Sequence, residues 1–390
     1  MNSIPYLFFV FFNVLLMLYG ILIKTDKNNL IFIRIVCLST CVLFFGFRGF
    51  IGWDWYNYYV LFNDVPKINS NELIPYFGNT LMEPAFILYC SVLKLFSDSY
   101  HILTLVNCII DLIFLNLFLK KYLPLKYYAF GFILYFIFGG FYFETDLLRN
   151  SRSFFIFLLT IKYIEERKIL HYYFFNSIGI LFHLSSIIYL FVYKILNLNI
   201  KRYFFIFIFI IGNILFVFNI QYVKPLIEFA SSIIGGKMSY LVNVYFIDDA
   251  KSYGLSIGFI ERNIMALLVI FYFNEIKNYN KTYNIFINSY FIYFILFFFF
   301  SEVSVLSTRF GLLFYYSYWI LLPIIFDIMK PKITKLIFII GIVSFFFLKM
   351  YGMTKADNYL YENTLVNESD YYKKKEVFEI FLNSNGDQKN

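Results

Sequence analysis

The chain has 390 residues, of which 61% are hydrophobic and only 15% are charged. A soluble domain keeps about a quarter of its residues charged, so this composition excludes an ordinary soluble protein and indicates a lipid environment. The net charge of +8 does not indicate nucleic-acid binding, because Lys and Arg fall in short clusters between apolar runs. The four cysteines lie inside apolar runs and predict neither a disulfide framework nor a metal site.

Apolar runs long enough to cross a bilayer recur along the chain, since a membrane helix needs about 20 apolar residues. The convincing runs are 4–23, 30–47, 101–119, 127–143, 150–164, 203–220, 257–273, 285–300, 310–328 and 333–351. We therefore predict an all-α polytopic membrane protein, similar to the GT-C class, with about 10–12 transmembrane helices. Residues 1–351 are expected to form one membrane domain, and 352–390 a polar tail with a surface amphipathic helix from Tyr371 to Leu382.

The charges of the connecting segments predict the topology. Just over half of the 33 Lys and Arg residues lie in six short connections, which the positive-inside rule assigns to the cytoplasm: 24–34, 120–126, 162–171, 194–202, 277–281 and 330–335. The first cations follow the first apolar run, which predicts an N-terminus on the outer side. Four polar segments are then expected to share the outer face: 48–82, 144–152, 221–256 and 301–309.

Two apolar stretches do not fit this topology as simple crossings. Residues 83–96 form a short run containing Lys94, and the positions of the neighbouring loops favour a half-helix or re-entrant segment. Residues 172–195 require an even number of crossings but are too short for two, which predicts a helix broken around His183. Irregular backbone at membrane depth is tolerated only beside protein or a water-filled cavity, so both stretches are candidate cavity walls.

The first outer segment begins with Arg48, two glycines, Asp54 and Tyr58, interleaved with Trp53 and Trp55. Glycine permits a tight turn or the close approach of a ligand. An arginine binds phosphate or carboxylate in bidentate fashion, a carboxylate can act as a base, and tryptophans can stack on sugar rings. The alternative interpretation is a belt of interfacial aromatic residues with an arginine that extends towards the headgroups.

Glu83 and His183 are further candidates for acid–base chemistry. Glu83 precedes Pro84 at a helix start, where it is either an ordinary capping residue or a carboxylate at the mouth of a cavity. His183 lies within an apolar stretch, where it is either a core residue or a functional group, because ionisable residues at membrane depth are usually functional.

Arg149 and Arg152 lie at the end of the segment 144–152, where the next apolar helix begins, and are expected to share a helix face. Guanidinium groups at a helix N-terminus oppose the helix dipole, which an anionic ligand at the same place would explain. The alternative is ion pairing with Glu144 and Asp146, two carboxylates whose spacing also weakly suggests a divalent metal. A similar choice between pairing and function applies later in the chain to Glu302 and Arg309, and to Glu261 and Arg262.

At these residues the chain resembles the EpsG-like branch of the Wzy polysaccharide polymerases, over roughly residues 30–330. The resemblance rests on the loop from Arg48 through Asp54 to Tyr58, on Glu83-Pro84, on Arg149, on Phe182-His183 with Ser185, and on a span that begins with Arg309. The family often has Arg-Gln where this chain has Arg149-Asn150.

The resemblance implies an O-antigen polymerase type of glycosyltransferase in the bacterial cytoplasmic (inner) membrane, with its active site facing the periplasm. Such proteins join undecaprenyl-pyrophosphate-linked repeat units into O-antigen or a related surface polysaccharide, alongside flippase and chain-length regulator proteins. Arginines suit the charge of the leaving pyrophosphate, and a carboxylate or histidine suits the proton of the acceptor hydroxyl. The residues predicted to bind substrate are Arg149, Arg152 and Arg309, followed by Arg48 and Tyr58. The alternatives for the base are Asp54, Glu83 and His183. No metal or other cofactor is expected.

Two rival functions are compatible with the sequence. One is a different polyprenyl-linked glycosyltransferase, such as an O-antigen ligase, which would use the same arginine and histidine chemistry. The other is a flippase or transporter of lipid-linked sugars, in which charges lie near the bilayer midplane. The predicted placement of most charged candidates at the outer face favours an enzyme over a transporter.

Overall fold

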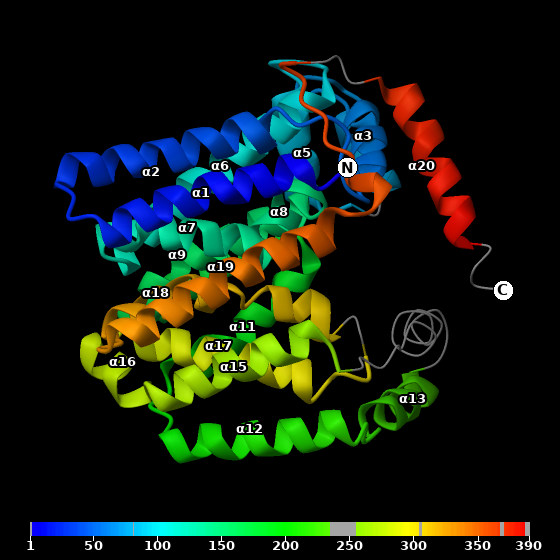
Figure 1. The fold of residues 1–390 in the computed structure, drawn as a ribbon. Helices are drawn as coiled ribbons and strands as arrows, with labels where there is room; N and C mark the ends of the chain where they lie inside the picture. Colours follow the sequence, from blue (N-terminus) through cyan, green and yellow to red (C-terminus); the bar gives the residue numbers. More distant parts are fainter. Residues whose placement is uncertain (1, 81, 235–254, 304–305, 367–369, 387–390) are drawn as a thin grey trace. The chain divides into compact units, whose positions relative to one another are not determined.

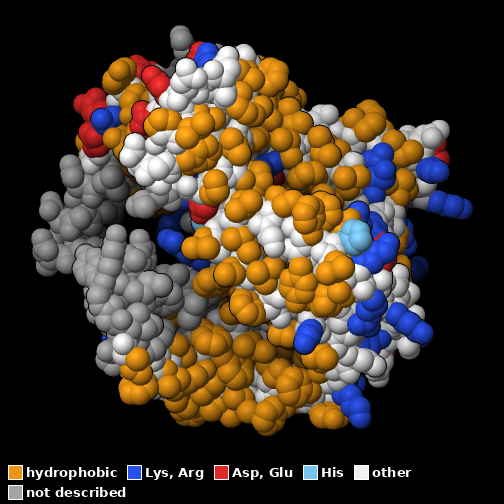
Figure 2. All heavy atoms as spheres, turned by 180° about the vertical axis from the view of Figure 1, so that it is seen from behind, with side chains coloured by type: hydrophobic (Ala, Val, Ile, Leu, Met, Phe, Trp, Pro, Cys, Tyr) orange, Lys and Arg blue, Asp and Glu red, His pale blue; other side chains and the backbone are white. Residues whose placement is uncertain are grey.

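The computed structural model describes residues 2–80, 82–234, 255–303, 306–366 and 370–386. The regular elements of these residues are helices or helical turns, and the β-type pairing among them is an isolated bridge between Arg48 and Asn363. The predicted all-α class is therefore confirmed. Figure 2 shows hydrophobic side chains covering broad areas of one face, as expected for a surface that meets lipid.

The described chain divides into two compact units, 1–190 with 331–390 and 191–330. The first unit contains α1 (Ile4–Leu22), α2 (Lys27–Cys41), α3 (Trp55–Asp64), α4 (Leu73–Asn79), α5 (Pro84–Leu93), α6 (Tyr100–Tyr122), α7 (Tyr128–Tyr135), α8 (Phe141–Thr145), α9 (Leu148–Glu165), α10 (Ile169–Phe182), α19 (Lys332–Thr354) and α20 (Tyr371–Gly386). Helix α11 (Ile188–Asn197) begins in it. The prediction of a single membrane domain with a separate tail stays a prediction.

Among its described residues, the second unit contains most of α11 and six further α-helices: α12 (Arg202–Val217), α13 (Val223–Ile234), α15 (Ile257–Phe271), α16 (Phe273–Tyr279), α17 (Tyr283–Phe298) and α18 (Tyr316–Ile328). Its predicted outer segments 221–256 and 301–309 lie partly outside the described residues. Where they are described they meet, because the Glu302 carboxylate accepts hydrogen bonds from the first backbone N–H groups of the α13 region at residues 222–224.

Five helical segments among the described residues are long and apolar enough to cross a membrane: 4–22, 27–46, 100–122, 125–145 and 332–354. The bent pair α15 and α16, which meet at 65°, adds a sixth if the pair counts as one span. Six more apolar helices among the described residues have 10–17 residues and fall short of that length, so the expected number of about 10–12 spans stays a prediction. The run 310–328, for example, becomes a regular α-helix only at Tyr316.

Both irregular stretches have the predicted character. Helix α5 has ten residues, a length of about 15 Å, which is half of the hydrocarbon thickness of a bilayer. Helix α10 ends at Phe182, His183 is extended (φ −160°, ψ 124°), and a 3₁₀ turn from Leu184 to Ile187 leads into α11. The predicted half-helix and the predicted break at His183 are thus confirmed.

Segments distant in the sequence meet at one end of the first unit. The side chain of Asn2 donates to Asp357, and the Tyr6 hydroxyl donates to the Tyr359 carbonyl. The tail also contacts the first outer segment, where the N–H groups of Gly49 and Gly52 donate to tail carbonyls. In Figure 1 the N-terminus, α3 and α20 lie at the same end of this unit. The N-terminus, the start of the segment 48–82 and the tail therefore meet at one end of this unit.

Candidate functional site

Glu83 is placed by the proline that follows it. A residue before proline avoids the helical conformation, and Glu83 is extended (φ −66°, ψ 136°) immediately before α5. Its side chain does not cap the first turn of α5. The carboxylate is consequently available to groups on other elements.

The carboxylate of Glu83 joins two residues that are distant in the sequence. One guanidinium N–H group of Arg149, at the start of α9, donates to Glu83 Oε2 at 2.6 Å. The other oxygen, Oε1, lies 2.9 Å from Nδ1 of His183, and it also accepts the N–H of Leu184 at 3.3 Å. Three of the predicted site residues, Glu83, Arg149 and His183, therefore form one cluster, here called the triad.

The triad is partly open, and its charges are matched. The side chains of Glu83, Arg149 and His183 are 16%, 25% and 25% exposed, so a ligand can reach them. Burial opposes ionisation of Glu83, but the hydrogen bond from His183 and the charge of Arg149 outweigh it and lower the pKa of Glu83 to about 2. Glu83 is thus an anion at any physiological pH.

The ionised carboxylate determines the orientation of the His183 ring. Because an ionised carboxylate can only accept hydrogen bonds, Nδ1 of His183 carries the proton that it donates to Glu83. The other ring nitrogen, Nε2, then points away from Glu83 with a lone pair in the neutral ring. A histidine oriented by a carboxylate in this way is suited to accept a proton from a hydroxyl group.

A cavity of about 430 Å³ lies beside Arg149, and we call it the arginine cavity. Asp54, Tyr58, Met82 and Arg149 are among the residues that line it. The Tyr58 hydroxyl accepts the backbone N–H of Arg149 at 3.5 Å, and the Met82 sulfur lies 3.2 Å from the guanidinium. Burial raises the pKa of Tyr58 to about 12 despite the charge of Arg149, so its hydroxyl remains protonated.

The outer segment is anchored to the start of α9 through Gly52 and Asp146. Gly52 has a positive φ of 98°, which favours glycine, and a Cβ there would collide with a carboxylate oxygen of Asp146. That oxygen instead accepts the backbone N–H groups of Trp53 and Asp54. The same carboxylate accepts the Tyr359 hydroxyl of the tail at 3.0 Å. This anchor keeps Asp54 and Tyr58 next to Arg149.

A sequence model of the EpsG family matches residues 30–365. The chain belongs to the EpsG family. No curated protein and no solved structure matches it. Membership indicates a glycosyltransferase-like polymerase that acts on polysaccharide repeat units, and the membrane helices agree with a multi-pass membrane protein.

Two of the arginines predicted to bind substrate lie away from the triad. Arg48 is only 1% exposed; its guanidinium donates to the Phe45 carbonyl at 3.0 Å, and its backbone pairs with Asn363 of the tail. Arg152 is 4% exposed and forms an ion pair with the fully buried Asp111. This differs from the expectation that both bind substrate, because protein groups surround them and leave no approach for a phosphate.

The expected common face of Arg149 and Arg152 separates into two environments. Arg149 faces Glu83, whereas Arg152 also donates to the Asn107 carbonyl inside the helix bundle. The carboxylates of Glu144 and Asp146, considered above as their partners, accept hydroxyls from Tyr135 and Tyr359 instead. In the described parts of the EpsG-family chain, no group of three His, Cys, Asp or Glu residues is arranged to hold a metal ion.

The aromatic residues of the outer segment have different roles. Trp53 is 42% exposed, but Trp55 is 1% exposed and packs against Phe50 and Phe378. Trp55 is therefore a core residue, which differs from the expectation that both tryptophans contact sugar. The interfacial-belt interpretation does not describe it either, because the ring faces protein.

The remaining candidates lie in the second unit. Arg309 is exposed on the helical turn Leu306–Phe310, and its role in binding pyrophosphate stays a prediction. Glu302 holds the start of α13, as described above. The guanidinium of Arg262 lies 3.8 Å from the centre of the Phe297 ring, a cation–π contact that accounts for a cation in an apolar helix.

Sequence reasoning missed two residues that support the site. Asp111, which neutralises Arg152, lies in the middle of an apolar run, and a carboxylate at membrane depth was a usable signal. Tyr359, which holds Asp146, lies in the tail more than two hundred residues away. No local pattern predicts that contact.

Proposed function

We propose that this EpsG-family protein polymerises undecaprenyl-pyrophosphate-linked oligosaccharide repeat units into O-antigen or a related surface polysaccharide. The reaction would take place at the periplasmic face of the bacterial cytoplasmic membrane. The observation that carries the proposal is the triad. The carboxylate of Glu83 binds both Arg149, which lines the arginine cavity, and the ring of His183. These are the two groups that such a transfer requires.

In the proposed reaction, a hydroxyl oxygen of the next lipid-linked unit attacks the anomeric carbon of the growing chain. The new glycosidic C–O bond forms as the bond between that carbon and the pyrophosphate oxygen breaks. Nε2 of His183 takes the hydroxyl proton. Undecaprenyl pyrophosphate leaves with the bonding electron pair, and Arg149 stabilises its developing negative charge.

Glu83 is assigned a positioning role. A carboxylate with a pKa of about 2 is a weak base, whereas efficient general bases have pKa values near the working pH. Glu83 instead holds the guanidinium of Arg149 and the ring of His183 in place. Asp54 lines the arginine cavity and is proposed to accept a hydrogen bond from a sugar hydroxyl.

Reconstitution tests this function directly. The purified chain in proteoliposomes is given undecaprenyl-pyrophosphate-linked repeat units, and the products are separated by gel electrophoresis. We expect a ladder of lengths from the natural chain. We expect rates about 10²–10³ lower for Arg149→Ala and about 10²–10⁴ lower for His183→Gln.

Lys94→Ala is the matched control, because this cation binds backbone carbonyls of residues 63 and 65 outside the triad. It should retain the ladder. Movement of lipid-linked units across the bilayer without bond formation would instead identify a flippase. Transfer of preformed chains to a different acceptor, without elongation, would identify a ligase.

A further inference from the structure

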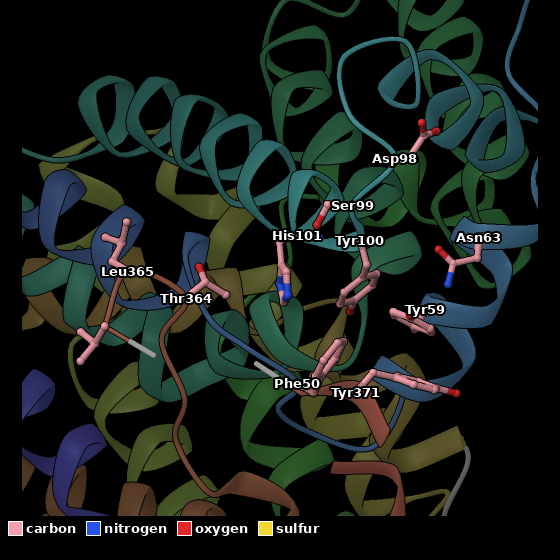
Figure 3. A pocket seen from close by; sticks show the side chains of 11 residues that line it. Phe50, Tyr59, Asn63, Asp98, Ser99, Tyr100, His101, Thr364, Leu365 and Tyr371 are labelled. Atoms are coloured by element: carbon pink, nitrogen blue, oxygen red, sulfur yellow. Dashed lines mark hydrogen bonds between the residues drawn. The ribbon is translucent and has the colours of Figure 1, made fainter. Parts of the chain in front are cut away.

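A second cavity, of about 420 Å³, lies next to the tail, and we call it the tail cavity (Figure 3). Its lining comes from the outer segment, α3, the start of α6 and the tail. Tyr59 and Asn63, four residues apart on α3, face it, whereas Tyr58 and Leu61 line the arginine cavity. One helix therefore separates the two cavities. A volume of this size is in the range of small-ligand sites.

Aromatic rings form much of the lining. Phe50 and Tyr100 are nearly fully buried and stack with their ring centres 5.8 Å apart. Tyr59 and Tyr371 stack at 4.0 Å, with only 15° between their planes, and both are partly exposed. A pyranose presents a flat face of C–H groups that packs well on such rings.

Polar groups complete the lining. Asn63, Asp98, Ser99 and His101 border the cavity in Figure 3. These groups offer amide, carboxylate, hydroxyl and imidazole atoms, which match the donors and acceptors of sugar hydroxyls.

The charge of the lining distinguishes the two cavities. None of the eleven described residues around the tail cavity is Lys or Arg, and the carboxylate among them, Asp98, is ion-paired at 2.9 Å with Lys67, which does not line the cavity. A phosphate group would meet no cation in the lining itself, and the nearby Lys67 is already neutralised by Asp98. The arginine cavity offers Arg149 on the opposite side of α3. The tail cavity therefore suits an uncharged polyhydroxy ligand.

We propose that the tail cavity binds an uncharged saccharide segment of the glycan, at a distance from the reacting pyrophosphate. This inference rests on the proposed function for the identity of the glycan. The tail would then be part of the substrate-binding surface, because Tyr371 and residues 364–366 form one wall. Binding of sugars other than the reacting one would also keep the growing glycan on the protein between successive transfers.

The test measures binding without turnover. The probes are lipid-free oligosaccharides of one, two and three repeat units, released by mild acid from the surface polysaccharide of the cell that makes the protein. Titration calorimetry of the full chain in nanodiscs should detect binding that strengthens with length. Tyr371→Leu keeps an apolar side chain but removes the ring, and should weaken binding about three- to ten-fold.

Two further variants separate recognition from folding. Tyr372→Leu alters the neighbouring residue on α20, which is 80% exposed and does not line the cavity, and should bind as the natural chain does. Asp98→Asn changes a lining residue outside α20 and should also weaken binding. The inference is overturned if the three-unit fragment does not bind, or if Tyr371→Leu and Asp98→Asn bind it normally.

Arg149→Ala separates this inference from the proposed function. It removes the cation of the other cavity, so it should slow polymerisation about 10²–10³-fold but leave fragment binding unchanged. Polymerisation without fragment binding would overturn the tail-cavity inference alone. Fragment binding that requires the Tyr371 ring, with no polymerisation by the natural chain, would overturn the proposed function alone. In cells, Tyr371→Leu should shorten the most abundant chain length rather than leave single units.

Discussion

At the scale of single residues, the informative group is the carboxylate of Glu83. Each of its oxygens has a different partner, Arg149 or His183, and the three residues come from separate elements. Arg149 is positively charged and His183 donates a hydrogen bond, which explains why this largely buried carboxylate remains ionised. The same contacts orient the two groups to which we assign chemistry.

This charge arrangement predicts a pH-dependent contribution of Glu83 to stability. Its pKa falls on folding, from 4.5 to about 2, so the ionised form stabilises the fold above about pH 4.5. That contribution is lost as the pH falls from about 4.5 towards 2. Thermal unfolding of Glu83→Gln should therefore begin a few degrees below that of the natural chain near pH 6.

Near pH 3 the two unfolding temperatures should approach each other. Glu72→Gln is the control, because this carboxylate is exposed and lies outside the triad. A difference between Glu83→Gln and the natural chain that grows as the pH falls would contradict the assigned sign.

At the scale of elements, α9 carries one arginine that borders a cavity and one that forms a buried ion pair. Arg149, on its first turn, borders a cavity, whereas Arg152, one turn later, pairs with Asp111 inside the bundle. Removal of one partner from a buried ion pair leaves an uncompensated charge, which costs about 3–5 kcal/mol. Arg152→Ala should therefore destabilise the protein strongly.

Arg149→Ala should lower the rate of polymerisation strongly, as stated above, with a much smaller loss of stability, since its side chain is 25% exposed. Fluorescence-detected thermal unfolding in detergent compares the two variants. The double variant Arg152→Met with Asp111→Leu should recover much of the stability, because no charge remains unpaired. Equal unfolding temperatures for the two single variants would contradict this division.

The turn before α3 makes a second prediction at the element scale. Gly52→Ala would place a Cβ against the Asp146 carboxylate at a positive φ, so the anchor of the outer segment should break. Backbone strain of this kind costs about 1–3 kcal/mol. Polymerisation should fall with it, because Asp54 and Tyr58 lose their position. Gly78→Ala on α4 is the control, since a Cβ there meets open space. A fully active Gly52→Ala would show that the anchor is dispensable.

At the scale of the whole molecule, the tail returns to the outer segment. Its backbone and side chains contact Gly49, Gly52 and Asp146, and α20 packs on α3 through Tyr371. Helix α19 is long enough to cross the bilayer from the basic segment at 330–335. The tail and the segment 48–82 must accordingly face the same compartment, which we propose is the periplasm.

Single cysteines test this arrangement. Cys37, Cys41, Cys90 and Cys108 are all buried, so a membrane-impermeant maleimide should label the natural chain weakly. In intact spheroplasts, the maleimide should label Tyr372→Cys on the tail and Ile74→Cys in the outer segment. Lys24→Cys, in the loop after α1, should be labelled only after lysis. Labelling of Tyr372→Cys only after lysis would place the tail in the cytoplasm.

A feature of the fold or the site was predictable from the sequence when the interactions behind it act between residues close together in the chain. Composition and apolar runs determined the membrane class, because the cost of exposing polar backbone or charge to lipid applies residue by residue. Loop charges and span length likewise determined the half-helix at 83–96 and the break at His183. The chemistry of their side chains was enough to identify Glu83, Arg149 and His183 as candidate site residues.

Only the tertiary structure decided which candidates meet. Arg48, Arg149 and Arg152 look alike in the sequence, yet two are enclosed by partners and one borders a cavity. The charge partners of Arg149 and Arg152, which are Glu83 and Asp111, come from other parts of the chain, and packing brings them together. The position of the tail depended in the same way on contacts across more than two hundred residues. The burial of a side chain, and hence its charge partner and its access to substrate, is a property of the packed fold.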